Sequence, residues 1–298
     1  MFDKAFGIEI EFTGITREQA AKVVAEFLNG TIHERGGVYD AREITAPDGR
    51  VWKIVRDSSI YPQTNEHGEV IDASDLYKVE LVSPILTYRE DIETVQELVR
   101  RLRHAGGLTN GSTGIHCHLN GADHTPRSVR NFVNIIASKN DLLYKALQIE
   151  ADRMRYCKKM DSYMVDRLNR SKPKTFEEIE EIWYEGYNGY RDSHYHESRY
   201  QFVNLHALFH GHHTLELRAF NSTLHAGVLR SYIVLALALN NQALTQRSAS
   251  PKKCQEENEK FAMRVFLNRI GFIGEEFKNC REHLCKHLSG NAAWRYRA

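Results

Sequence analysis

The chain has 298 residues, of which 42% are hydrophobic and 27% are charged, a composition typical of globular proteins. Forty lysines and arginines against 39 aspartates and glutamates give a net charge of +1. A chain with so little net charge has no long-range field that would hold nucleic acid or an anionic membrane, so we expect neither as a partner.

The amino-terminal segment MFDKAFGIEI has no basic region followed by a long apolar stretch, which argues against a secretory signal and favours a cytoplasmic location. The cysteines lie at positions 117, 157, 254, 280 and 285 and form no CxxC pair. We therefore expect free thiols in a reducing compartment and no zinc-thiolate site.

The predicted elements mix short strands with longer helices. The expected strands are, in chain order, GIEIEF from Gly7, KVELVS from Lys78, TGIHCHLN from Thr113, RYQFVNLHAL from Arg199 and HTLELRAF from His213. Helices are expected after Thr16, Thr87 and Thr125 and over about residues 226–245 and 256–288. This order predicts an α+β fold on a largely antiparallel sheet. We expect one domain over residues 1–298, with a peripheral insertion at about residues 150–198.

Alternation along these strands places one kind of side chain on one face. Because side chains at i and i+2 of a strand share a face, Glu9 and Glu11 point the same way, and His116 and His118 point away from Cys117 between them. The residues that alternation sets opposite the apolar face are Glu9, Glu11, Glu80, His116, His118, Glu216 and Arg218.

A solvated strand face would also explain Glu9 and Glu11, since amphipathic antiparallel strands show polar residues to water. Exposed strands usually mix Thr, Lys, Ser and Gln, however, whereas these strands select metal-ligating and anion-binding types. Crowded carboxylates raise one another's pKa, and divalent cations remove that repulsion. Carboxylates with an occasional imidazole suit Mg²⁺ or Mn²⁺, which take further ligands from substrate phosphates.

Four segments, GIEIEF, KVELVSP, GSTGIHCHLN and TLELRAFNSTL, together resemble the amidoligase family of carboxylate-amine ligases, which are related to glutamine synthetase and γ-glutamylcysteine ligase. The resemblance extends from Gly7 to the carboxyl-terminal GNAAWR. It implies a glutamine-synthetase-like catalytic domain, with a curved sheet and helices on its outer face. It also implies an ATP-dependent reaction through an acyl phosphate, which an amine converts to an amide.

The resemblance further implies roles for individual residues. The implied metal ligands are Glu9, Glu11, Glu80, His116 and Glu216. The implied nucleotide and phosphate contacts are His118, Arg218 and Arg199, with Arg218, Arg199 and Glu216 as the catalytic set. The substrate-binding candidates are Asp57, Arg56 and Asn204, although Asp57 is equally compatible with a turn.

Other functions stay open at this stage. An HCH strand also begins the site of some zinc hydrolases, although these need a third His or an Asp where this chain offers Glu and Arg. A non-catalytic relative that only binds a peptide is another alternative. The histidines at 206, 210, 212 and 213 either bind a transition metal or occupy a hairpin loop. The substrates of a ligase are expected to be an amino acid, a peptide or a cell-wall fragment with an amine.

Overall fold

The computed structural model describes residues 2–253 and 257–293. In this part of the chain, nine strands form one sheet in the order β10-β11-β9-β1-β7-β4-β3-β2, with β8 beside β1. All their pairings are antiparallel. The strands of this sheet are β1 (Ala5–Phe12), β2 (Thr31–Gly36), β3 (Ala41–Thr45), β4 (Val51–Val55), β7 (Val79–Val82), β8 (Leu86–Thr87), β9 (Gly114–Asn120), β10 (Val203–Asn204) and β11 (Thr214–Asn221). A separate hairpin joins β5 (Gln63–Glu66) to β6 (Glu69–Asp72).

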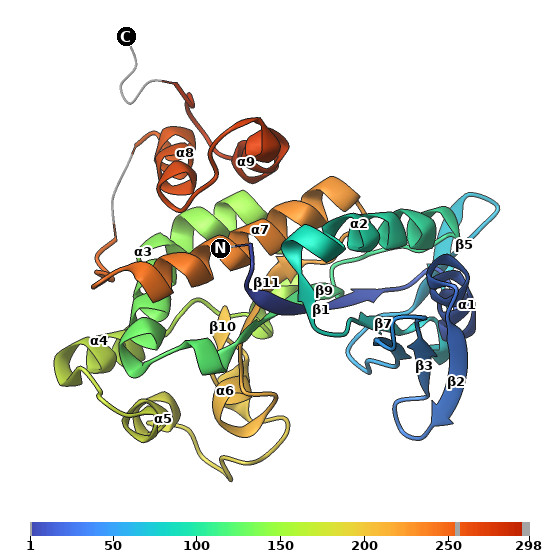
Figure 1. The fold of residues 1–298 in the computed structure, drawn as a ribbon, viewed down its shortest axis with the longest axis horizontal. Helices are drawn as coiled ribbons and strands as arrows, with labels where there is room; N and C mark the ends of the chain where they lie inside the picture. Colours follow the sequence, from blue (N-terminus) through green and yellow to red (C-terminus); the bar gives the residue numbers. More distant parts are fainter. Residues whose placement is uncertain (1, 254–256, 294–298) are drawn as a thin grey trace.

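The helices are α1 (Arg17–Leu28), α2 (Tyr88–His104), α3 (Pro126–Leu147), α4 (Ser162–Ser171), α5 (Phe176–Tyr184), α6 (His206–His210), α7 (Ala226–Thr245), α8 (Glu259–Arg269) and α9 (Lys278–Cys285). Helices α2 and α7 run along one side of the sheet, and α4, α5 and α6 lie apart from them (Figure 1). Helix α7 contacts β9, α2 and α3, while α1 contacts β3 and β4. The α+β prediction is confirmed by this arrangement of helices on an antiparallel sheet.

The core forms where the apolar residues of the strands meet these helices. Ile8 and Ile10 of β1 pair with Cys117 and Ile115 of β9, and all four side chains are buried. Helix α7 is apolar on nearly all sides because it packs between the sheet and other helices. In the described ranges, no helix combines the length and the apolar character needed to cross a membrane.

The helix after Thr16 begins as predicted. The Thr16 side chain accepts a hydrogen bond from the Gln19 amide, and the Gln19 side chain accepts one from the Thr16 amide. This capping box satisfies two amide groups that the first helical turn leaves without partners. The chain leaves the helix at Asn29, which has a left-handed conformation with φ of 51°.

The prediction of a continuous strand at RYQFVNLHAL is wrong. Only Val203 and Asn204 pair with β11, and the chain then enters the short helix α6. The Asn204 side-chain oxygen accepts a hydrogen bond from the Ala207 amide at 3.3 Å, which favours a helical turn over a longer strand.

The prediction of one helix over residues 256–288 is also wrong. Two helices, α8 and α9, are separated by Gly271 and Gly274, whose φ angles are 104° and 86°. Such positive φ angles are incompatible with a right-handed helix, so the chain breaks there. Residue 256 lies outside the described residues.

The five strands from β2 to β6 were not predicted. Strands β2 and β6 are mostly exposed, so their sequences lack the apolar alternation that marks a half-buried strand.

In the expected insertion at 150–198, α4 and α5 contact each other and α4 contacts α3. Trp183 of α5 is buried. The domain limits and the insertion stay predictions.

Candidate functional site

The register of the sheet places the predicted polar residues beside one another. Residues directly opposite on antiparallel strands have Cβ atoms about 4.5 to 5.5 Å apart. The opposed pairs are Glu11 with Glu80, Glu9 with His116, and Glu216 with His118. These residues come from four neighbouring strands, which follow one another in the sheet in the order β11-β9-β1-β7.

These six side chains and that of Asp57 form what we call the carboxylate cluster. They make three groups in which one ligand atom from each residue lies within 4.8 Å of the others. The groups are Glu9 with His118 and Glu216, Glu9 with Glu80 and His116, and Glu11 with Asp57 and Glu80. Because Glu9 and Glu80 each belong to two groups, the three groups form one continuous site.

Each histidine of the cluster lies between carboxylates. His116 Nδ1 is 2.9 Å from Glu9 Oε2, and its Nε2 is 3.6 Å from Glu11 Oε1. His118 Nε2 is 3.2 Å from Glu9 Oε1, while its Nδ1 is 2.9 Å from the Thr214 hydroxyl. The contact with Thr214 orients the ring, so that Nε2 points toward the cluster.

The carboxylates at one end of the cluster carry uncompensated charge. The pKa of Glu80 lies well above its ordinary value because the side chain is removed from water and faces the negative charges of Glu9, Glu11 and Asp57. Burial also raises the pKa of Glu11; His116 opposes this shift and Asp57 adds to it. A cation beside Glu80 would relieve this repulsion.

The carboxylates at the other end are better compensated. Burial alone would raise the pKa of Glu216, but Arg218 and the two cluster histidines outweigh it and lower the pKa to about 2. Burial likewise opposes ionisation of Glu9, yet His118 and His116 hold the Glu9 pKa well below its ordinary value. These two groups are therefore ionised near neutral pH.

Arg218 reaches the cluster through an irregularity in β11. Between Leu217 and Phe220 the strand contains one residue more than the facing part of β9, a bulge that turns the local side chains. The buried Arg218 guanidinium forms an ion pair with Glu216. Its Nε has no hydrogen-bond partner within the described part of the chain.

Asn204 and Arg56, both substrate-binding candidates, are engaged with protein groups. The Asn204 amide donates to Glu216 Oε2 at 2.6 Å and so orients that carboxylate. Arg56 donates to both carboxylate oxygens of Asp75, at 2.7 and 2.8 Å. Their roles toward a substrate stay predictions.

Arg199 ends the short 3₁₀ helix η4 (Glu197–Arg199). Its Nη1 donates to the carbonyl of His194 at 3.0 Å, and its guanidinium lies over the rings of Tyr195 and Tyr200. No ion pair between Arg199 and the carboxylate cluster is found among the described residues. A contact between Arg199 and a phosphate remains a prediction.

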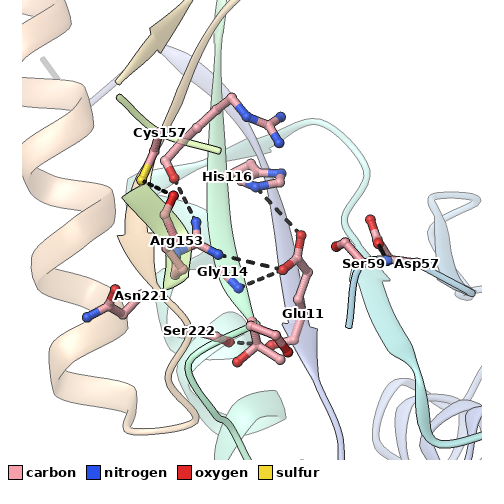
Figure 2. A network of polar contacts seen from close by, with 12 residues as sticks. Glu11, Asp57, Ser59, Gly114, His116, Arg153, Cys157, Asn221 and Ser222 are labelled. Carbon is pink, nitrogen blue, oxygen red and sulfur yellow. Dashed lines mark hydrogen bonds and ion pairs between the residues drawn. The ribbon is translucent and has the colours of Figure 1, made fainter. Parts of the chain in front are cut away.

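Asp57 and Arg153 both lie beside Glu11 in a way that the sequence did not indicate. Asp57 follows β4 and accepts a hydrogen bond from the Ser59 amide at 2.6 Å, as in a turn, yet it also belongs to the metal-ligating group with Glu11 and Glu80. Arg153 comes from the expected insertion and lies with its Nη1 3.8 Å from Glu11 Oε2 (Figure 2). No pattern in the surrounding sequence distinguishes Arg153 from an exposed arginine.

The later histidines form a different environment. All four lie in or at the end of the connection between the antiparallel strands β10 and β11, as the hairpin interpretation predicted, although this connection contains the short helix α6. The His206 ring and the Tyr184 hydroxyl share a hydrogen bond of 2.6 Å. Within the described ranges, the groups able to hold a metal ion do not include these histidines.

The cysteines at 117, 157, 280 and 285 are buried free thiols, as predicted, and Cys254 lies outside the described residues.

Comparisons with known proteins give a family match and a structural similarity. No curated protein matches the chain. Among solved structures, it is similar to a bifunctional glutathione synthetase from Pasteurella multocida, with 15% identity and a TM-score of 0.38 over 96% of this chain and 47% of that one. The chain thus spans about half the length of that protein. Residues 3–240 match the family described as "Putative amidoligase enzyme". This match includes all the carboxylate-cluster residues and most of the chain, which therefore belongs to the amidoligase family.

Proposed function

We propose that the protein is an ATP-dependent carboxylate-amine ligase with a glutamine-synthetase-like catalytic domain. The observation that carries this proposal is the carboxylate cluster, in which three groups of potential ligand atoms overlap on one face of neighbouring strands. Membership of the amidoligase family supports a reaction that forms an amide bond.

The donor atoms of the cluster fit Mg²⁺ or Mn²⁺. Two of the three groups combine two carboxylates with one imidazole, and the third contains carboxylates alone. Hard divalent cations prefer such oxygen-rich ligand sets. Glu9, Glu11, Glu80, His116 and Glu216 would hold the ions, with His118 and Asp57 as further ligands. Bound ions would supply positive charge to the phosphates of ATP.

The reaction that we propose has two steps. A carboxylate oxygen of the first substrate attacks the γ-phosphorus of ATP, and ADP leaves. The nitrogen of the amine substrate then attacks the acyl carbon, inorganic phosphate leaves, and the nitrogen loses a proton to give the amide. Phosphoryl transfer depends mainly on positioning and charge stabilisation, so no protein nucleophile is required.

The arginines and His118 complete the proposed nucleotide side of the site. Arg218 is suited to a phosphate oxygen because a guanidinium forms directed, charge-assisted hydrogen bonds with phosphate. Its buried Nε has no hydrogen-bond partner among the described residues. His118 would contact the nucleotide beside it. Arg199 remains a candidate for the transferred phosphoryl group, and Asp57, Arg56 and Asn204 for the substrates.

The distribution of the two histidines favours the ligase over a zinc hydrolase. Zinc in hydrolases is usually held by two or three histidines or cysteines in one coordination sphere. In the part of the chain that is described, His116 and His118 belong to different groups, and each lies with two glutamates. The arrangement instead resembles a row of cation positions bridged by carboxylates.

Release of ADP tests the proposed function directly. The protein is incubated with ATP, Mg²⁺, a panel of amino acids and peptides as carboxylates, and a panel of amines. We expect ADP and phosphate to form only when a suitable pair is present, with an amide product detected by mass spectrometry. Product formation without nucleotide would support a hydrolase, and peptide binding without turnover would support a non-catalytic relative; either result would overturn the proposal.

A further inference from the structure

We propose that Arg153 is a positioning residue, which fixes the carboxylate of Glu11 in the orientation that a divalent cation requires. The inference rests on the proposed function, because it concerns the cation site that Glu11 shares with Asp57 and Glu80. It adds to the site a residue from outside the strands, carried by the 3₁₀ helix η3 (Ala151–Arg155).

Arg153 and the backbone of β9 hold one oxygen of Glu11 together. The amide of Gly114 donates to Glu11 Oε2 at 2.6 Å, and Arg153 Nη1 lies 3.8 Å from the same oxygen (Figure 2). The other oxygen, Oε1, lies 3.6 Å from His116 Nε2. The two contacts on Oε2 therefore leave Oε1 as the oxygen directed into the cluster.

The backbone of β9 makes room for the guanidinium because residue 114 is a glycine. A Cβ atom at this position would lie 1.9 Å from Arg153 Nη1 and 2.2 Å from its Cζ. Real Cβ atoms do not approach other atoms so closely, so any larger residue would displace the guanidinium. The guanidinium of Arg153 thus occupies the space that a side chain at residue 114 would fill.

Other contacts hold Arg153 in place. Its Nη2 donates to the carbonyl of Arg218 at 2.9 Å, and the Arg153 carbonyl accepts from the Cys157 thiol at 3.2 Å. The Tyr144 hydroxyl, on α3, donates to the carbonyl of Cys157. These contacts join the segment around Arg153 both to α3 and to the bulge that carries Arg218.

The burial of Arg153 fits a positioning role rather than a surface role. Its exposed fraction is 2%, and that of Glu11 is 4%. A carboxylate buried to this degree without a cationic neighbour is strongly destabilised in its ionised form. Arg153 is thus a buried cation beside one end of the cluster, as Arg218 is beside the other, although its contact with Glu11 is the longer of the two ion pairs.

Binding of Mn²⁺ to the purified full chain tests this inference without any catalytic assay. Free Mn²⁺ is measured by electron paramagnetic resonance during a titration. Loss of a residue that orients a ligand usually weakens metal binding about 10- to 100-fold. We expect Arg153→Met to weaken at least one Mn²⁺ site by this factor while the best-compensated site persists. Arg153→Lys should restore part of the affinity, since it keeps the charge but loses the fork.

Gly114→Ala provides a second route to the same change, because the added Cβ displaces the guanidinium while leaving residue 153 unchanged. We expect it to weaken the same Mn²⁺ site as Arg153→Met. The double variant should be no weaker than either single variant, since both remove one interaction. Full additivity of the two effects would overturn the inference.

Arg17→Met is the matched control. Arg17 is also a buried arginine, with an exposed fraction of 3%, but its hydrogen bonds go to Asp40 and to the carbonyls of Asp75 and Lys78, none of which belongs to the cluster. We expect it to lower the unfolding temperature while leaving Mn²⁺ affinity unchanged. If Arg153→Met does not fold, Arg153→Lys and Gly114→Ala decide the question.

Two failures are distinguishable in this experiment. Wild-type Mn²⁺ affinity at every site in Arg153→Met, or an equal loss in Arg17→Met, would overturn the positioning role and leave the proposed function intact. No binding of Mn²⁺ or Mg²⁺ by the unsubstituted protein, even with an ATP analogue, would overturn the proposed function itself.

Discussion

Two groups of histidines in this protein have opposite electrostatic surroundings. In the carboxylate cluster, burial lowers the pKa of His118, but Glu9 and Glu216 outweigh it and the pKa rises. In a second group, which we call the histidine-tyrosine cluster (Tyr184, His196, His206 and His210), burial and the neighbouring His196 and His210 lower the pKa of His206 to about 4. Negative neighbours thus favour a positive charge on His118, whereas burial and neighbouring histidines disfavour one on His206.

The comparison shows why a concentration of histidines alone does not identify a site. The rings of His196 and His206 stack with centroids 5.6 Å apart, and the Tyr184 ring meets both edge-on. These contacts are aromatic packing between α5, α6 and the preceding loop. The carboxylates, supplied by strands β1, β7 and β11, make the difference in the other cluster.

The largest difference between the two clusters should be in catalysis. We expect Glu216→Ala and His116→Ala to reduce ADP release by at least about a hundredfold, more than loss of a residue that merely orients a ligand. Both variants should keep the wild-type circular dichroism spectrum. His206→Asn is the control in the histidine-tyrosine cluster and should retain ADP release. Undiminished release in the two cluster variants would remove the basis for the ligase proposal.

Added metal should stabilise the folded protein through the carboxylate cluster and not through the histidine-tyrosine cluster. A ligand at about 100 times its Kd that binds only the folded state raises the free energy of unfolding by about 2.7 kcal/mol. We expect Mg²⁺ or Mn²⁺ to raise the unfolding temperature of the chelator-treated protein, and of His206→Asn by the same amount. Glu9→Ala should lose most of the increase, because Glu9 belongs to two of the three groups. An equal increase in Glu9→Ala would place the ions elsewhere.

The histidine-tyrosine cluster should in turn control stability at mildly acid pH. The folded-state pKa of His206, about 4, is below the ordinary histidine value, so the unfolded chain binds a proton first as the pH falls. Stability should therefore decrease by about 2 kcal/mol between about pH 7.5 and about pH 5 through this residue. Denaturant unfolding at both pH values should show a smaller decrease in His206→Asn. An unchanged decrease would mean that other groups cause it.

The smallest predicted effect concerns repulsion within the cluster. Glu80 lies directly opposite Glu11, and like charges in that position are destabilising by up to about 1 kcal/mol. Glu80→Gln should therefore stabilise the chelator-treated protein by about this amount and weaken its stabilisation by Mg²⁺. Glu43, on β3, has cationic neighbours in Arg35 and Lys53, so Glu43→Gln is a control that should not stabilise. A destabilised Glu80→Gln protein would show that the two carboxylates do not repel.

The sequence carried the information on which face each strand residue occupies, since side chains alternate along a strand regardless of its neighbours. It predicted that Glu9 and Glu11 share a face and that Cys117 lies in the core. The strand order and register, which set Glu11 opposite Glu80, depend on contacts between segments far apart in the chain. Alternation within one strand therefore could not reveal the three ligand groups.

Residues outside regular strands were the least predictable. Arg153 is delivered by a 3₁₀ helix within the expected insertion, and its approach to Glu11 depends on the absence of a side chain at Gly114. Asp57 was interpreted either as a substrate contact or as a turn residue, but its place beside Glu80 follows from the position of β4 next to β7. In both cases tertiary packing, which no local pattern records, decides what the side chain meets.

A crystal structure with Mn²⁺ and a non-hydrolysable ATP analogue tests the central claim most directly. Anomalous scattering locates each Mn²⁺ independently of the protein density. We predict Mn²⁺ peaks among the carboxylate-cluster groups, with the terminal phosphate of the analogue beside them and near Arg218. Mn²⁺ bound only at the histidine-tyrosine cluster, or a nucleotide bound away from Glu9, Glu80 and Glu216, would contradict the account.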